Sequence, residues 1–207
     1  QGNFDISYLR CIPNMVIMAP KDENELQHMM KTSIHYQAGP TAIRYPRGEV
    51  VGVAMDKEMT ILPIGRGELV TADSDHPEIL FIGFGYGVQT SLEVRRLLQA
   101  EGISSAVINA RFAKPLDEAL LLEWMGRAKL TVTVEENAVM GGFGSGILEL
   151  LAKNGLHHDV LTVGVPDLFI DHASPKLQRE LTGLDSPSIA ALAASRLRSL
   201  TQPGDLI

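Results

Sequence analysis

The 207-residue chain has room for one large domain or two small ones, and its net charge of -7 argues against a general nucleic-acid-binding protein. Hydrophobic residues make up 45% of it and charged residues 21%, as in globular proteins, and no apolar run reaches the roughly 18 residues of a membrane span. The single cysteine, Cys11, excludes an internal disulfide and fits a reducing compartment. Because the sequence begins with Gln1, without Met or a signal pattern, we expect a fragment or a processed chain.

The first 50 residues predict a strand–helix–strand unit. The apolar run 14–20 (NMVIMAP) predicts a buried strand, and Asp22 with Glu25 predicts a capping box before a helix over about 22–37. The helix face expected to be buried carries Leu26, Met29, Met30 and Ile34. A second buried strand, parallel to the first, is expected over 41–45. One such unit is too small to bury both faces of its sheet, so we expect it to be the last part of a larger domain.

The sequence pattern changes after residue 50, and residues 51–74 are predicted to form a linker. In this region, 50–53 and 62–70 could form short strands. From residue 78 onward, apolar runs and helical patterns alternate. The expected strands are 79–83, 104–110, 130–135 and 160–165, and the expected helices are 88–101, 117–128, a segment ending near 154, 175–182 and 187–200. This alternation predicts a second, complete α/β unit whose mostly parallel sheet is covered by helices on both faces.

Arg47 is the candidate binding residue of the first unit. Pro46 ends strand pairing and Gly48 lets the chain turn, so Arg47 is expected at the carboxyl end of a strand, where open α/β sheets bind ligands. A guanidinium in this place suits a phosphate or a carboxylate ligand, or else it pairs with a nearby acidic side chain. Position alone slightly favours the pairing, and the residue types leave both roles open.

The glycine-rich turn 141–146 (GGFGSG) lies between an expected strand and an expected helix. Its spacing matches neither the G-x-G-x-x-G fingerprint nor a P-loop, so we interpret it as tight helix packing rather than a phosphate cradle. Glu135 and Glu136 precede it, and we expect one exposed carboxylate and one that orients a loop or a neighbouring subunit. Arg111 and Lys114 could bind an anion or pair with these two glutamates, and we favour the pairing.

The histidines predict no zinc site. His28 and His35 are seven residues apart on one expected helix, and the adjacent pair 157–158 has no cysteine or carboxylate at ligand spacing. His172 follows Asp171 in a loop and is interpreted as structural.

Four motifs together resemble the 1-deoxy-D-xylulose-5-phosphate synthase family of transketolase-like, thiamine-diphosphate-dependent enzymes. They are QGNFDISYLRCIPNMVIMAPKDENEL (1–26), GPTAIRYPRG (39–48), ARFAKPLDEALL (110–121) and VTVEENAVMGGFGSG (132–146). The motifs keep the family's order, and the first two are the most specific. The resemblance implies that 1–50 is the C-terminal part of a pyrimidine-binding domain, 51–74 a linker and 75–207 a transketolase C-terminal domain.

The same resemblance implies a transferase that condenses pyruvate with D-glyceraldehyde 3-phosphate and releases CO₂, in non-mevalonate isoprenoid biosynthesis and in the supply of thiamine and pyridoxal precursors. It implies thiamine diphosphate and Mg²⁺ as cofactors, a cytoplasmic homodimer, and no nucleic-acid or membrane partner. The family's activating glutamate, diphosphate-binding aspartate motif and active-site histidine would all precede Gln1. We therefore expect no catalytic, cofactor-binding or metal-binding residue in this chain, which would be inactive without the N-terminal part of the enzyme.

The resemblance assigns Arg47, the second arginine of RYPRG, to the phosphate of glyceraldehyde 3-phosphate, whereas Arg44 is expected in a structural pair. Gln1 and Gly2 are expected on the floor of the pocket. Two other functions stay open at this point. The chain could be a beta subunit of a 2-oxo acid dehydrogenase, or a non-catalytic dimerisation or docking module whose glycine-rich turn binds a regulator.

Overall fold

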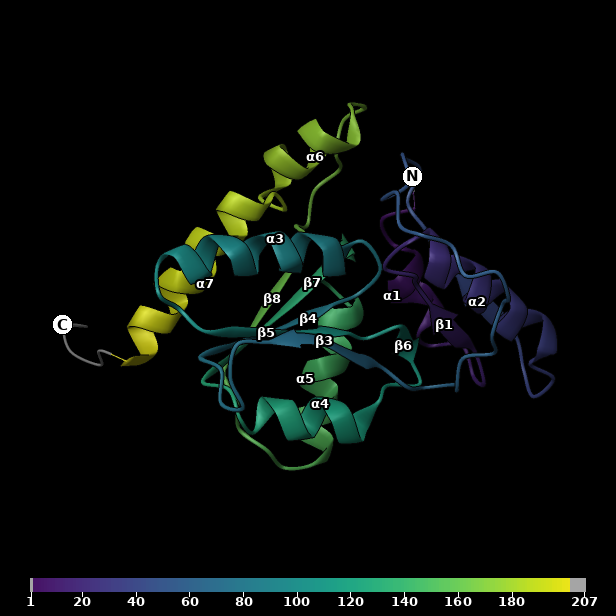
Figure 1. Ribbon diagram of the computed structural model, residues 1–207, viewed down its shortest axis with the longest axis horizontal. Helices are drawn as coiled ribbons and strands as arrows, with labels where there is room; N and C mark the ends of the chain where they lie inside the picture. Colours follow the sequence, from purple (N-terminus) through teal and green to yellow (C-terminus); the bar gives the residue numbers. More distant parts are fainter. Residues whose placement is uncertain (1, 202–207) are drawn as a thin grey trace.

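The computed structural model describes residues 2–201, and these residues form two sheets that lie next to each other. The smaller sheet has the strand order β2-β1-β6 and the larger one the order β3-β5-β4-β7-β8. In Figure 1, α1 and α2 lie with the small sheet at one end of the molecule, α3 and α7 cover one face of the large sheet, and α4 and α5 cover the other. The predicted α/β class, with helices on both faces of a mostly parallel sheet, is confirmed.

The first unit is the expected strand–helix–strand arrangement, preceded by the short helix α1 (Asp5–Leu9). It consists of β1 (Val16–Met18), α2 (Glu23–His35) and β2 (Thr41–Ile43), with β1 and β2 parallel. Asp22 caps α2 as predicted, since its side chain accepts a hydrogen bond of 2.8 Å from the amide of Glu25. The prediction of a buried second strand was wrong, because β2 is the outer strand of its sheet and is only half-buried.

The buried face of α2 differs from the predicted one. Glu25, His28, Met29 and Thr32 are buried. Met30 and Ile34, by contrast, are 52% and 72% exposed. The reason is that α2 packs against an extended segment whose backbone needs polar partners. The Glu23 carboxylate accepts from the amides of 51–53, His28 Nδ1 from that of Thr60 and Thr32 Oγ1 from that of Leu62.

The second unit follows the predicted alternation. Its elements are β3 (Glu68–Ala72), β4 (Ile79–Gly83), α3 (Gly87–Ala100), β5 (Ser105–Asn109), β6 (Phe112–Lys114), α4 (Glu118–Met125), β7 (Leu130–Ala138), α5 (Phe143–Lys153), β8 (Val160–Val165), α6 (Pro175–Thr182) and α7 (Ser186–Thr201). β5, β4, β7 and β8 run parallel, and β3 is an antiparallel edge strand. No helix of the described part of the chain is long and apolar enough to span a membrane.

Two strands depart from the sequence-based expectation. β3 forms the end of the segment predicted as a linker, and residues 50–53 form no strand. β6 was not predicted, and it leaves the large sheet to pair antiparallel with β1. The second unit therefore adds a strand to the sheet of the first, so the two units share one structural framework.

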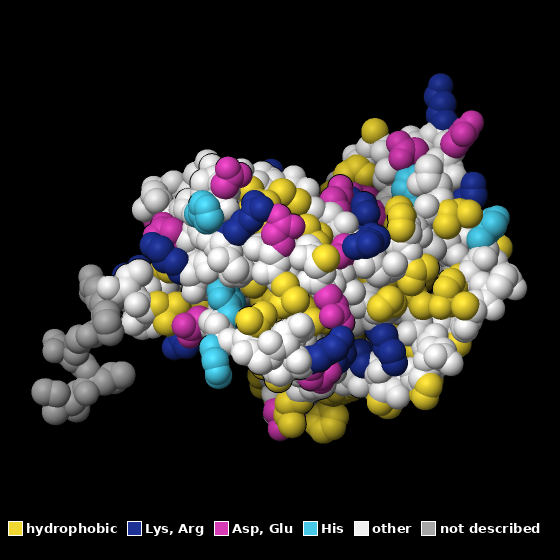
Figure 2. Space-filling model, turned by 90° about the horizontal axis from the view of Figure 1, so that it is seen from below, with side chains coloured by type: hydrophobic (Ala, Val, Ile, Leu, Met, Phe, Trp, Pro, Cys, Tyr) yellow, Lys and Arg dark blue, Asp and Glu magenta, His cyan; other side chains and the backbone are white. Residues whose placement is uncertain are grey.

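The surface carries no broad patch of one charge in the view of Figure 2, where Lys and Arg side chains are interspersed with Asp and Glu. On the face that Figure 2 shows, side chains of the two signs therefore lie side by side.

Candidate functional site

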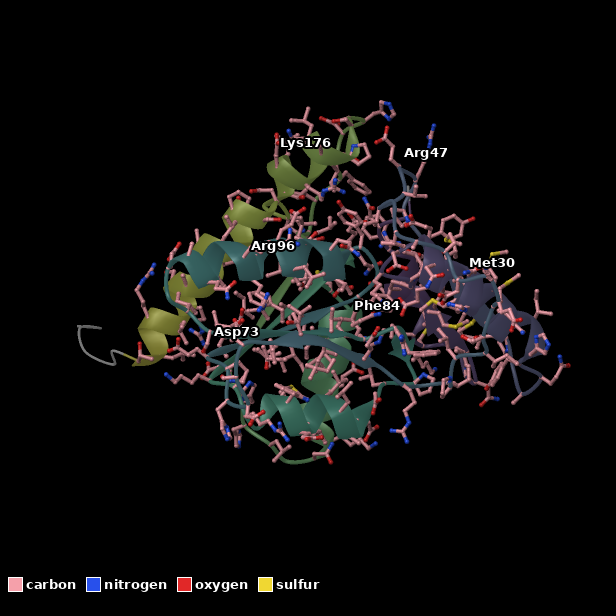
Figure 3. The ribbon with its side chains drawn as sticks, in the orientation of Figure 1. Met30, Arg47, Asp73, Phe84, Arg96 and Lys176 are labelled. Carbon is pink, nitrogen blue, oxygen red and sulfur yellow. The ribbon has the colours of Figure 1, made fainter. Side chains whose placement is uncertain are left out.

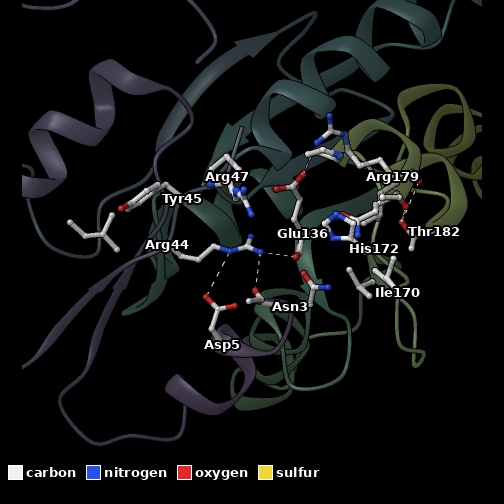
Figure 4. Close-up of a pocket in the computed structure, with 18 of the residues that line it drawn as sticks. Asn3, Asp5, Arg44, Tyr45, Arg47, Glu136, Ile170, His172, Arg179 and Thr182 are labelled. Carbon is white, nitrogen blue, oxygen red and sulfur yellow. Dashed lines mark hydrogen bonds and ion pairs between the residues drawn. The ribbon is translucent and has the colours of Figure 1, made fainter. Parts of the chain in front are cut away.

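A cavity of about 630 Å³ lies at the junction of the two units, where the end of β2 meets α6 and the loop before it. Figure 4 shows this cavity with side chains from both units around it. The first unit contributes Gly2, Asn3, Asp5, Arg44, Tyr45 and Arg47, and the second contributes Glu136, Ile170, His172, Gln178, Arg179 and Thr182. Gln1, which was expected on the pocket floor together with Gly2, lies outside the described residues.

Arg44 joins the two units at the base of the cavity. Its guanidinium donates to the backbone carbonyl of Glu136 at 2.8 Å and to that of Gly2 at 3.2 Å, and it lies 3.8 Å from the carboxylate of Asp5. The structural role expected for Arg44 is confirmed by these contacts. They fix the end of β2 against β7 and so determine where the residues after Arg44 can reach.

Glu136 and Arg179 form the second ion pair of the cavity, with 3.0 Å between Arg179 Nη1 and Glu136 Oε1. The Arg179 guanidinium also lies 4.7 Å from the centre of the Tyr86 ring, at a distance typical of a cation–π contact. Arg179 is thus held between a carboxylate and an aromatic face. Arg179 is not among the residues predicted from the sequence, because nothing in the local pattern of α6 places it opposite β7.

Arg47 lies just beyond the end of β2 and lines the cavity (Figures 3 and 4). It is exposed, and it forms no hydrogen bond or ion pair with any residue between 2 and 201. The acidic partner that position alone slightly favoured is therefore not found within the described chain. Three arginines against two carboxylates line the cavity, so its net charge is positive and favours an anion.

The side chain of Glu135 occupies the space enclosed by the glycine-rich turn 141–146. Glu135 is buried, and its two carboxylate oxygens accept from the amides of Phe143 at 2.7 Å and Gly144 at 2.8 Å, at the start of α5. A Cβ atom on Gly142 would lie 2.5 Å from Glu135 Oε2, and one on Gly144 would lie 2.7 Å from Thr133 Oγ1. The interpretation of this turn as tight packing is confirmed, because the carboxylate of Glu135 occupies the place that a phosphate would need.

The predicted pairing of Arg111 and Lys114 with the two glutamates of β7 was wrong. Arg111 pairs with Glu25 at 2.6 Å and with Glu68 at 3.0 Å, whereas Lys114 donates to backbone carbonyls of residues 10 and 12. The reason is that Lys114 lies in β6 and Arg111 directly precedes it, and β6 pairs with β1 rather than with β7. Neither glutamate is exposed as one was expected to be: Glu135 is buried, and the Glu136 side chain is 20% exposed.

Burial raises the pKa of Glu135 to about 7, although the amides of Gly144 and Phe143 and the charges of Arg10 and Arg44 act in the opposite direction. Since this pKa exceeds the ordinary value of 4.5, the folded chain keeps a proton that the unfolded chain releases. Protonation of Glu135 therefore stabilises the folded chain. This stabilisation is fully present below about pH 4.5 and is lost as the pH rises through 7. We expect a loss of about 3 kcal/mol in the free energy of unfolding.

Urea unfolding of the wild type and of Glu135→Gln, followed from about pH 5 to pH 8, measures this loss. The Gln side chain does not titrate, so the stability of the variant should lack this component. Parallel pH profiles for the two proteins would contradict the assignment of the component to Glu135.

Two domain models match the chain: the pyrimidine-binding domain of transketolase over residues 1–52 and the C-terminal domain of transketolase over residues 68–189. The 1-deoxy-D-xylulose-5-phosphate synthase of Heliobacterium modesticaldum is 50% identical over 192 residues, which are 93% of this chain and 29% of that protein. The synthase of the same name from Brevibacillus brevis is 48% identical over 201 residues, which are 97% of this chain and 31% of that protein. The chain thus spans less than a third of these relatives.

Among solved structures, one described as a split-gene transketolase, inactive beta4 tetramer, superimposes with a TM-score of 0.82 at 28% sequence identity. The match covers 96% of this chain and 63% of that one. The likeness therefore extends over both units and over the junction between them.

Proposed function

The chain belongs to the transketolase family, and from this premise we propose that it is the C-terminal part of a 1-deoxy-D-xylulose-5-phosphate synthase. The whole enzyme would be a thiamine-diphosphate-dependent transferase that condenses pyruvate with D-glyceraldehyde 3-phosphate and releases CO₂. Its product would supply isoprenoid, thiamine and pyridoxal precursors in the cytoplasm. Of the three functions considered from the sequence, the two relatives described above support this one over a dehydrogenase beta subunit or a docking module.

The proposed contact with the substrate phosphate depends on Arg47. Its guanidinium lines a cavity of positive net charge without a partner among residues 2–201, and it is the second arginine of the RYPRG motif. In the proposed role it donates charge-assisted hydrogen bonds to the phosphate of glyceraldehyde 3-phosphate. Arg44 holds the end of β2 through the Glu136 carbonyl, and Gly2 lies at the same cavity.

The cofactors are proposed to bind mainly outside this chain. Within the part of the chain that the structure describes, no group of three or more His, Cys, Asp or Glu side chains could hold a metal ion. The residues that the structure describes therefore do not fit a diphosphate–Mg²⁺ site. We propose that 1–50 complete a pyrimidine-binding domain, that 51–74 link it to a C-terminal domain over 75–207, and that the active enzyme is a homodimer.

A coupled assay tests the proposal. The chain is produced together with the N-terminal part that its relatives carry, and product formation is followed with pyruvate, glyceraldehyde 3-phosphate, thiamine diphosphate and Mg²⁺. We expect turnover only when both substrates are present, and none from the 207-residue chain alone; the split-gene transketolase described as an inactive tetramer is a parallel case. Tight binding of thiamine diphosphate to this chain alone, measured by calorimetry, would overturn the domain assignment.

A further inference from the structure

We propose that the second unit supplies the opposite wall of the phosphate site, with His172 as a second ligand of the phosphate that Arg47 binds. The inference rests on the function proposed above and extends it, because His172 lies in the C-terminal domain. Both residues line the same cavity, and in Figure 4 they lie on opposite sides of Glu136. The substrate would then be held between the two units rather than by the first unit alone.

The loop that carries His172 is anchored on both sides. Phe169 lies edge-on to Phe4 of the first unit, with 6.4 Å between the ring centres. Gln178 of α6 donates a hydrogen bond of 2.9 Å to the backbone carbonyl of Asp171. Ser174 caps α6, since its hydroxyl accepts from the amide of Leu177 at 3.3 Å. These contacts place His172 at the cavity without using its imidazole ring.

Among the arginine and histidine side chains that line the cavity, Arg47 and His172 are the two without a partner in residues 2–201. Arg44 lies next to Asp5, and Arg179 is paired with Glu136. In contrast, neither Arg47 nor His172 forms a hydrogen bond or an ion pair with any residue in the range 2–201. An imidazole carries an N–H donor in its neutral form and two in its protonated form, so it can bind a phosphate oxygen in either state. One donor from each unit suits a phosphate, which offers several acceptor oxygens.

Steady-state kinetics of the full-length enzyme test this assignment. We expect His172→Ala to raise the KM for glyceraldehyde 3-phosphate by about threefold to tenfold, the effect of losing one hydrogen bond. The KM for pyruvate and the turnover of unphosphorylated D-glyceraldehyde should not change, because neither uses the phosphate site. His172→Gln should recover part of the loss through its amide donor. His157→Ala is the matched control, since His157 is an exposed histidine away from the cavity.

The outcomes separate this inference from the proposed function. If Arg47→Ala raises the KM for glyceraldehyde 3-phosphate and His172→Ala does not, the inference is overturned and the function stands. If the full-length protein forms no product from the two substrates, the proposed function fails, and the inference fails with it. Should His172→Ala impair folding, inorganic phosphate is titrated into the unmodified 207-residue chain and the histidine ring protons are followed by NMR. The inference requires the His172 signals to shift while the His157 signals stay in place.

Discussion

Replacing Arg47 with alanine should raise the KM of the proposed full-length synthase for glyceraldehyde 3-phosphate by roughly tenfold to a hundredfold, equivalent to about 1.4–2.7 kcal/mol. This is the expected loss for a charge-assisted contact with a phosphate. Arg47 lines the cavity and has no partner among residues 2–201, so its removal leaves no acidic side chain of the described chain unpaired. The cost should therefore appear in substrate binding and not in stability.

Three comparisons make this result specific. The KM for pyruvate should stay nearly constant, because pyruvate has no phosphate. Arg47→Lys should recover part of the affinity, since an ammonium keeps the charge but loses the planar fork of donors. Arg96→Ala removes an exposed arginine of α3 that lies away from the cavity, and it should change neither KM (Figure 3). Equal effects of Arg47→Ala on both substrates would rule out a phosphate contact.

The large sheet was predictable because its local signals agree with one another. The run 79–83 (ILFIG) has no polar side chain, the run 130–134 (LTVTV) is made of Leu, Thr and Val, and both become buried parallel strands. Asp117 and Ser174 cap α4 and α6 near the starts of the helices predicted over 117–128 and 175–182. Each of these features depends on residues within a few positions of one another, which is the range over which sequence patterns are informative.

The junction between the units was not predictable in the same way. β6 has three residues and pairs with a strand almost one hundred positions earlier, so no local sequence pattern predicts it. The buried face of α2 was predicted wrongly because polar side chains of this helix accept hydrogen bonds from backbone amides of an extended segment. Such contacts leave no hydrophobic pattern in the sequence. Glu136, Arg179 and His172 meet at the cavity only through the fold. The resemblance could point to Arg47, but it could not show what lies opposite.

The same junction contains a buried charge cluster, and its loss should be the largest single effect on stability. The Glu25 carboxylate is 3% exposed. It accepts from Asn109 Nδ2 at 2.8 and 3.0 Å, from Arg111 Nε at 2.6 Å and from the amide of Lys21 at 2.8 Å. Arg111 also pairs with Glu68 of β3. The cluster therefore joins α2 of the first unit to the strands of the second.

Glu25→Ala removes the acceptor from the centre of this cluster, so that Asn109 loses its buried partner and Arg111 keeps only the more exposed Glu68. Breaking a buried ion pair by deleting one member costs about 3–5 kcal/mol, because the remaining charge stays desolvated. Urea unfolding of the 207-residue chain measures the loss as a lower transition midpoint. Glu123→Ala is the control: Glu123 forms an exposed pair with Arg127, so this substitution should cost no more than about 0.5 kcal/mol.

The double variant Glu25→Leu, Arg111→Met tests how the cluster stabilises the folded chain. If the lost stability comes from an unpaired buried charge, removing both partners should restore much of it, since apolar side chains of similar size often replace a buried ion pair without loss. If the hydrogen bonds themselves hold the two units together, the double variant should remain as unstable as Glu25→Ala. The second result would mean that the hydrogen bonds of the cluster, rather than the avoidance of an unpaired charge, hold α2 against the strands of the second unit.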